Sequence, residues 1–207
     1  LTPEALRAVL AVRPWHEKVA HKDAKLRTFI SDESDRGELV GHAYDITRGA
    51  LRPGIDGLVV IDDSIVRGTT LKQSILRMLS RLEPRRIVVV SSCPQIRYPD
   101  CYGIDMSRLD NLVAFRAAIA LAKERGREAE LRAIYADCVK TLAEVDDGVL
   151  GDSAMPPNHV LRLYGMFSDD EVSAKICEIV RPPTATCRVD ILYGTVQGLR
   201  ASIPDNC

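Results

Sequence analysis

Two unbroken apolar runs, at 58–61 and 87–90, flank a segment in which apolar residues recur at helical spacing. Short continuous apolar runs are typical of strands that are buried on both faces of a parallel sheet. The segment between them predicts a helix from Leu71 to Leu82, which should stop ahead of Pro84. A strand, a helix and a strand within about 35 residues form the right-handed crossover unit of a parallel sheet covered by helices. The sequence therefore predicts an α/β fold.

The first part of the chain carries weaker signals. Thr2, followed by a proline, predicts a short capped helix that should end before Pro14. Short strands are expected around Val19 and Phe29, and another at 39–46.

After residue 106 the chain becomes mainly helical. An alanine-rich segment at 112–121 predicts one helix, and the apolar residues of 131–142 predict a second, amphipathic one. The segment Ser168–Glu171 fits a capping box ahead of a third helix. Residues 188–193 predict a last strand.

The length of 207 residues, with 46% hydrophobic and 28% charged residues, allows one domain with appendages. We expect a core at 1–106 and a helical carboxy-terminal region at 107–207, with a small subdomain after about residue 150. The 28 basic and 29 acidic side chains leave a net charge of −1, which gives no large basic field. No apolar run approaches the roughly 20 residues of a spanning helix. We therefore expect a cytoplasmic protein without nucleic-acid or membrane partners.

The residues that follow the first apolar run carry the chemical signal. Asp62 and Asp63 stand at the carboxyl end of the predicted strand, where open parallel sheets bind their ligands. Ser64 and residues 68–70 offer hydroxyls and unobstructed backbone N–H groups where a helix begins, and Arg67 adds a cation. This pattern suits a ligand with hydroxyls at one end and a phosphate at the other, such as a sugar phosphate. The alternative is that the two carboxylates merely cap the next helix.

The complete string at 59–70 resembles the phosphoribosyl pyrophosphate (PRPP) motif of type I phosphoribosyltransferases. In the form Asp-Asp-Ser-Ile-Val-Arg-Gly-Thr-Thr it is similar to the amidophosphoribosyltransferases. Segments at 91–94 and 98–106 resemble the stretch after the next strand in those enzymes, and residues 27–30 resemble their flexible loop that closes over PRPP. The resemblance is strongest at 57–106 and implies a type I phosphoribosyltransferase-like parallel sheet flanked by helices.

The resemblance also implies roles for individual residues. Asp62 and Asp63 would be catalytic, would bind the ribose hydroxyls and would help to hold Mg²⁺, while Arg27 would approach the pyrophosphate. The loop around the 5-phosphate would consist of Ser64, Ile65, Val66, Arg67, Gly68, Thr69 and Thr70. The implied reaction transfers glutamine-derived ammonia to PRPP with release of pyrophosphate, giving 5-phosphoribosylamine for purine synthesis. PRPP and purine nucleotides are the implied ligands, and a homo-oligomer is the implied assembly.

The sequence also departs from this family. The family's glutaminase domain would lie upstream of Leu1, as would the strand and turn that bind pyrophosphate, so we expect a carboxy-terminal fragment that is inactive with glutamine. Asp100 stands where some members place an iron–sulfur cysteine, Cys101 is one residue further on, and the six cysteines form no C-x-x-C pair. We therefore expect free thiols and no iron–sulfur cluster.

Two other functions are compatible with the loop. One is a phosphoribosyltransferase that acts on a nucleobase, although the Tyr-Gly-Ile-Asp-Met string at 102–106 argues against it. The other is a PRPP- or nucleotide-sensing regulatory domain that retains the loop without catalysis.

Overall fold

The computed structural model describes residues 2–12, 19–22, 44–47, 49–100, 102–103, 106–149 and 155–203. They belong to two compact units, Leu1–Pro53 and Gly54–Cys207.

The smaller unit contains a helix and a strand pair. The expected capped helix is confirmed as α1 (Pro3–Ala11), with the Thr2 hydroxyl accepting the Ala5 N–H at 3.2 Å. Strands β1 (Ala20–Lys22) and β2 (Tyr44–Ile46) pair antiparallel. They correspond to the expected strands near Val19 and at 39–46, whereas the one around Phe29 lies outside the described residues.

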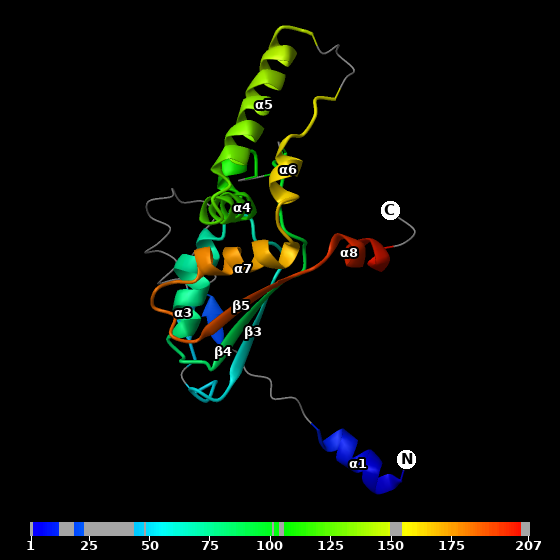
Figure 1. The fold of residues 1–207 in the computed structure, drawn as a ribbon. Coiled ribbons are helices and arrows are strands. Elements are labelled where there is room, and N and C mark those ends of the chain that lie inside the picture. Colours follow the sequence, from blue (N-terminus) through cyan, green and yellow to red (C-terminus); the bar gives the residue numbers. More distant parts are fainter. Residues whose placement is uncertain are drawn as a thin grey trace. The chain divides into compact units, whose positions relative to one another are not determined.

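The larger unit is built on a three-stranded parallel sheet in the order β3 (Gly57–Asp62), β4 (Arg86–Ser91) and β5 (Arg188–Tyr193) (Figure 1). The two apolar runs lie side by side in β3 and β4, in register from the first residue to the last. The expected last strand is β5, which pairs with β4. The α/β class with a parallel sheet and flanking helices is confirmed. The carboxy-terminal region, expected to be mainly helical, also completes the sheet.

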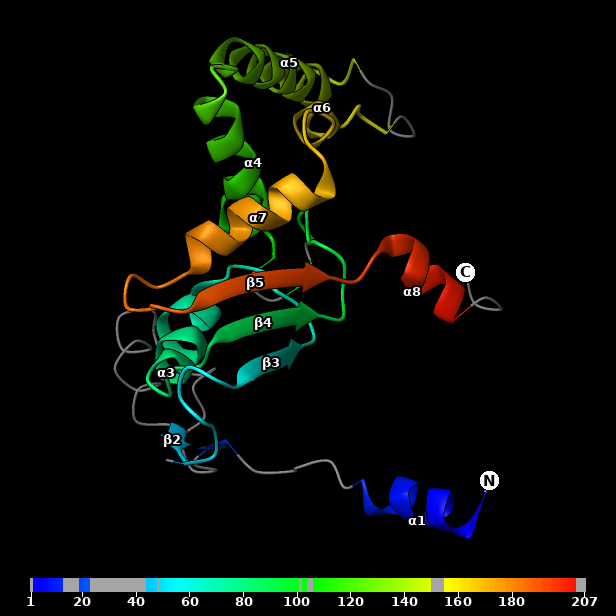
Figure 2. The ribbon, with the colours of Figure 1, turned by 60° about the horizontal axis from the view of Figure 1, so that its bottom comes forward.

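One face of the sheet forms the core of this unit. Ile87, Val89 and Ser91 of β4 and Val189 and Ile191 of β5 are buried on this face. Helix α7 (Asp169–Val180) runs along β5, as Figure 2 shows. The helix that follows β3 lies beside α7, because the Lys72 ammonium donates to the Ile179 carbonyl at 2.9 Å.

The other face of the sheet is open at β3. Val59 is 66% exposed and Ile61 is 78% exposed. The expectation that the run at 58–61 is buried on both faces is therefore wrong for the described residues. The reason is position: β3 is an edge strand of this three-stranded sheet, whereas β4 is central and the same type of run is better covered there.

The helix after β3 contains a wide turn. It begins at Thr69, passes through a π-helical turn, η1 (Leu71–Ile75), and continues as α3 (Leu76–Ser80). The Leu76 N–H donates to the Leu71 carbonyl, five residues back. The expected helix at 71–82 is confirmed, and it ends at Ser80, before the expected limit.

The remaining helices extend from α7. Helix α4 (Val113–Glu124) packs on α7 through small side chains such as Ala117 and Ala118, which allow a close approach. Helix α5 (Glu128–Asp146) and the short α6 (Val160–Tyr164) lie beyond α4, and α8 (Val196–Ser202) follows β5 (Figure 1). No helix among the described residues is long and apolar enough to cross a membrane.

Candidate functional site

The ends of β3 and β4 hold the two adjacent carboxylates in place. The chain of β4 continues alongside β3 after its last paired residue, because the Ser92 N–H donates to the Asp62 carbonyl and the Cys93 N–H to the Asp63 carbonyl, both at 3.0 Å. The Ser92 hydroxyl adds a bond to the Asp63 carbonyl at 3.1 Å. The backbone that carries both carboxylates is thus fixed at the carboxyl edge of the sheet, where parallel sheets bind ligands.

A glycine brings the end of β5 against the same edge. The Gly194 N–H donates to the Ser91 carbonyl at 2.9 Å. A Cβ atom at Gly194 would lie 2.4 Å from the Ser92 carbonyl oxygen, closer than any side chain can approach backbone. Ser92 belongs to the segment at 91–94 that resembles the amidophosphoribosyltransferases, whereas Gly194 is part of no motif in the sequence. The available signal was a glycine directly after an apolar strand, which often marks a close backbone approach.

The two carboxylates differ in their surroundings. Asp62 is half-buried and its Oδ1 accepts the Asp63 N–H at 3.1 Å, while Asp63 is exposed and its Oδ1 accepts the Ser64 N–H at 2.7 Å. Burial raises the pKa of Asp62 above its ordinary 3.8, and the neighbouring Asp63 carboxylate adds to the rise. The Asp63 N–H bond opposes it. Both carboxylates bond within the loop and the helix begins only at Thr69, so the capping alternative does not fit.

The loop between the carboxylates and the helix is anchored on α4. Ile65 is buried, the Val66 carbonyl accepts the Val113 N–H at 2.8 Å, and the Arg67 carbonyl accepts the Arg116 guanidinium at 2.5 Å. The expected 5-phosphate loop is thus an ordered turn with its path set by α4.

Gly68 lets the loop turn into the helix. Its φ of +73° lies in the left-handed region that favours glycine, and a Cβ atom there would lie 2.6 Å from Val180 Cγ1 of α7. Thr69 and Thr70 follow it, exposed, in the first turn of the helix. The first N–H groups of a helix have no intrahelical acceptor and attract anions. The structure therefore joins two carboxylates and a helix start in one loop, as the sequence predicts.

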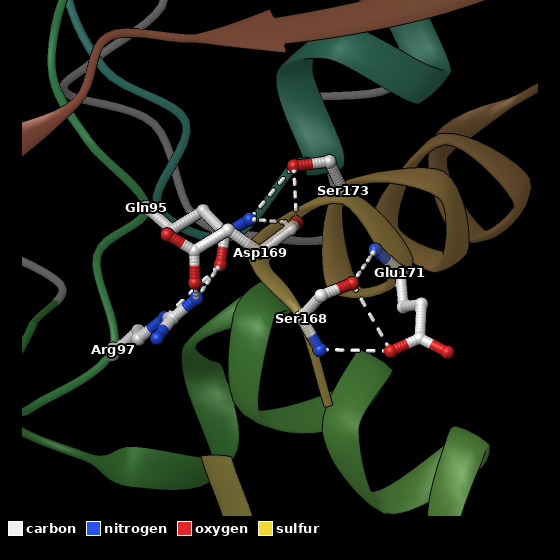
Figure 3. Close-up of polar contacts among 6 residues, drawn as sticks. All are labelled: Gln95, Arg97, Ser168, Asp169, Glu171 and Ser173. Carbon is white, nitrogen blue, oxygen red and sulfur yellow. Dashed lines mark hydrogen bonds and ion pairs between the residues drawn. The ribbon is translucent and has the colours of Figure 1, made fainter. Parts of the chain in front are cut away.

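The segment after β4 is tied to α7 (Figure 3). Arg97 donates to Gln95 Oε1 at 2.8 and 3.0 Å and forms an ion pair with Asp169. The Gln95 amide donates to the Asp169 carbonyl at 2.8 Å and to the Ser173 hydroxyl at 2.7 Å. The Arg97 guanidinium also lies 5.0 Å above the Tyr164 ring. These contacts fix the segment that leaves the carboxyl edge, and no motif in the sequence indicated them.

Mg²⁺ suits the donors at this edge. Mg²⁺ is commonly bound by one or two carboxylates together with substrate phosphates, a kind of donor set that two adjacent carboxylates fit. Among the described residues there is no cluster of three or more histidine, cysteine or acidic side chains that could hold a metal without a substrate. Arg27, Cys101 and Asp105 lie outside the described residues.

Known proteins resemble part of this chain. A Haemophilus influenzae protein is 47% identical over 58 residues, or 28% of this chain and 11% of that protein. A Saccharomyces cerevisiae protein is 38% identical over 101 residues (44% and 19%), and a Lachancea kluyveri protein is 37% identical over 146 residues (67% and 27%). Each is named an amidophosphoribosyltransferase. The matched part of this chain is related to amidophosphoribosyltransferases.

This relationship confirms the resemblance inferred from the motifs. The chain spans 11 to 27% of the length of these amidophosphoribosyltransferases. The match of 146 residues extends beyond the segment at 57–106, so the similarity to amidophosphoribosyltransferases is not confined to the loop and the next strand. No family model matches the chain.

Proposed function

We propose that the carboxyl edge of β3 and β4 binds PRPP with Mg²⁺, and that the chain supplies this site to an amidophosphoribosyltransferase. The reaction joins glutamine-derived ammonia to PRPP, releases pyrophosphate and forms 5-phosphoribosylamine, the first step of purine synthesis. The main support is the placement of Asp62 and Asp63, which Ser92 braces at the sheet edge and which one loop connects to the helix start at Thr69.

Each part of the loop has a role in this proposal. The helix start at Thr69 and Thr70, reached through the turn at Gly68, receives the 5-phosphate, because unpaired helix N–H groups and small side chains suit an anion. Asp62 and Asp63 accept hydrogen bonds from the ribose hydroxyls and hold Mg²⁺. When bound, Mg²⁺ neutralises charge on the pyrophosphate.

The carboxylates also act on the reaction itself. The bond from C1 of the ribose to the pyrophosphate oxygen breaks with its electron pair leaving on pyrophosphate, while the lone pair of ammonia forms the new bond to C1. The ribose carries positive charge as the first bond breaks, and fixed carboxylates nearby stabilise that charge. In this proposal Arg27 approaches the departing pyrophosphate, and closure of its loop limits attack by water.

A thermal-shift experiment tests the site. PRPP with Mg²⁺ should raise the melting temperature of the chain by a few degrees, since a ligand that binds only the folded state stabilises it by mass action. Asp63→Asn should abolish the shift, because it removes one carboxylate at the sheet edge. Asp147→Asn, which changes the charge equally at the exposed end of α5, is the matched control and should keep the shift.

The outcomes separate the three functions. No shift with millimolar PRPP, or an equal shift in Asp63→Asn, would contradict the site. Assayed in the longer protein, ammonia-dependent release of pyrophosphate supports the proposed reaction. Release that depends on a nucleobase would instead identify a nucleobase phosphoribosyltransferase, and binding without any turnover would identify a sensing domain.

A further inference from the structure

Two successive carbonyls of the loop after β3 are held by the first turn of α4. The Val66 carbonyl accepts the N–H of Val113, the first residue of α4, at 2.8 Å. The Arg67 carbonyl accepts Nη2 of Arg116, one turn further along α4, at 2.5 Å. Val113 is buried, so the first contact is a fixed point of the fold, whereas Arg116 is exposed and holds the loop through its side chain.

The bond from Arg116 determines where an N–H group of the loop points. In a trans peptide the C=O and the N–H point in opposite directions, and the described residues have no cis peptide bond. The Arg67 carbonyl and the Gly68 N–H belong to one peptide, so Arg116 turns this N–H away from α4. Gly68 itself is in the left-handed conformation, with a φ of +73°. Successive N–H groups in a turn of this kind form a concavity that binds anions.

The side of Gly68 that faces the helices has no room for a ligand. A Cβ atom at Gly68 would lie 2.6 Å from Val180 Cγ1 of α7 and 3.5 Å from Val113 Cγ2 of α4. The Gly68 N–H, which points the other way, has no acceptor in the part of the chain that the structure describes. A guanidinium bound to the carbonyl of the same peptide strengthens this N–H as a donor, because hydrogen bonds in a chain polarise one another.

We propose that Arg116 is a positioning residue of the 5-phosphate loop. Its guanidinium holds the Arg67 carbonyl on the α4 side, and the Gly68 N–H of the same peptide is thereby presented to the phosphate. Arg116 acts through this peptide and does not contact the ligand, and it lies outside the motif at 59–70. This role rests on the proposed function, in which the loop binds the 5-phosphate of PRPP.

Isothermal titration of the full chain with ribose 5-phosphate tests this role, because the ligand carries the 5-phosphate without the pyrophosphate. Arg116→Ala should weaken binding roughly tenfold, the usual effect of losing a hydrogen bond to a charged group. Arg116→Lys should recover binding to within about threefold of the parent, since an ammonium can still donate to the carbonyl. Arg132→Ala, which removes the same exposed side chain from α5, is the matched control and should bind like the parent.

The amide signal of Gly68 gives a second readout that a general loss of stability would not reproduce. In amide proton–nitrogen NMR spectra, its proton should move downfield when ribose 5-phosphate is added to the parent. In Arg116→Ala without ligand it should move upfield, because the polarising bond to the Arg67 carbonyl is lost. The Gly194 amide, which donates to the Ser91 carbonyl, is the internal reference and should stay in place in this variant.

The outcomes separate the role of Arg116 from the proposed function. If the parent and Arg116→Ala bind ribose 5-phosphate equally, or if the Gly68 signal is the same in both, the positioning role is overturned and the proposed function stands. If Arg116→Ala weakens ribose 5-phosphate but PRPP with Mg²⁺ gives the parent no thermal shift, the positioning role stands and the proposed function fails. If the parent binds neither ligand, both are overturned.

Discussion

At the scale of single residues, two glycines determine the shape of the site. Gly68 turns the loop into its helix with a positive φ and leaves room for Val180, and Gly194 brings the end of β5 within reach of the Ser92 carbonyl. A Cβ atom added at Gly68 would meet the Val180 side chain, which has some freedom to move, whereas one added at Gly194 would meet the Ser92 backbone. A side chain is tolerated less well at Gly194 than at Gly68, because strand ends that share hydrogen bonds cannot move apart independently.

We expect Gly194→Ala to destabilise the larger unit by about 2 kcal/mol or more, because its Cβ atom would meet backbone at 2.4 Å. Gly57→Ala is the matched control at the other end of a strand. Its Cβ atom would lie 3.6 Å from the Arg86 carbonyl, an ordinary contact, and its effect should stay within about 1 kcal/mol. Urea unfolding of both variants measures the difference. An equal decrease in the free energy of unfolding for the two variants would contradict this prediction, because it would show that the structure relieves the close approach at Gly194.

The raised pKa of Asp62 gives the proposed binding of PRPP a pH dependence. A carboxylate whose pKa is raised in the folded state takes up a proton above the ordinary 3.8, so it stabilises the folded protein when protonated and this contribution is lost as pH rises through the raised pKa. In the proposed site, PRPP with Mg²⁺ requires the ionised form of Asp62. We therefore expect the thermal shift by PRPP to shrink as pH falls toward the raised pKa of Asp62. A series from pH 8 to pH 4.5 measures this, and a constant shift would contradict it.

At the scale of elements, α7 holds the site together. Asp169 at its start receives Arg97 from the segment after β4, while Ile179 and Val180 at its end contact Lys72 and Gly68 of the loop and helix after β3. The capping box expected at its start is confirmed, with the Ser168 N–H donating to Glu171 Oε2 at 2.8 Å. A substitution that loosens the start of α7 should therefore also disturb the carboxyl edge of the sheet.

Glu171 makes this cap dependent on pH. The Ser168 N–H bond, together with the Arg125 guanidinium and the Ser168 hydroxyl, lowers the pKa of Glu171 from 4.5 to about 2. A lowered pKa stabilises the folded state above pH 4.5, and this contribution is lost as pH falls from 4.5 through about 2.

Glu171→Gln should therefore lower the melting temperature at pH 7, and its difference from the parent should narrow in acid. Asp170→Asn, an exposed carboxylate of the same turn, is the control and should change the melting temperature less. Thermal melts at several pH values measure both variants. A deficit that stays constant down to pH 3 would refute the assigned role of Glu171.

At the scale of the whole molecule, the sequence predicts the helices and strands of the larger unit well, and it predicts their burial and long-range contacts less well. The parallel sheet and its helices could be predicted from the periodicity of apolar residues, which is a local pattern. The position of the acidic pair at the sheet edge could be predicted because the apolar runs show where the strands end. Burial depends on what packs against a strand. The identical pattern of β3 and β4 therefore could not show that Val59 and Ile61 are exposed. The contacts of Gln95 and Arg97 join segments more than 70 residues apart, which no local pattern encodes.

The order of the sheet also affects how the molecule is made. Strand β4 pairs with β3, its near neighbour in sequence, and with β5, from which it is separated by residues 92–187. On a ribosome, β3 and β4 can pair early, while the other edge of β4 stays without its partner until synthesis passes Tyr193. During that interval the nascent chain presents an unpaired strand edge, the kind of surface that chaperones protect and that pairs wrongly between neighbouring chains. Slower translation between β4 and β5 would lengthen this exposure.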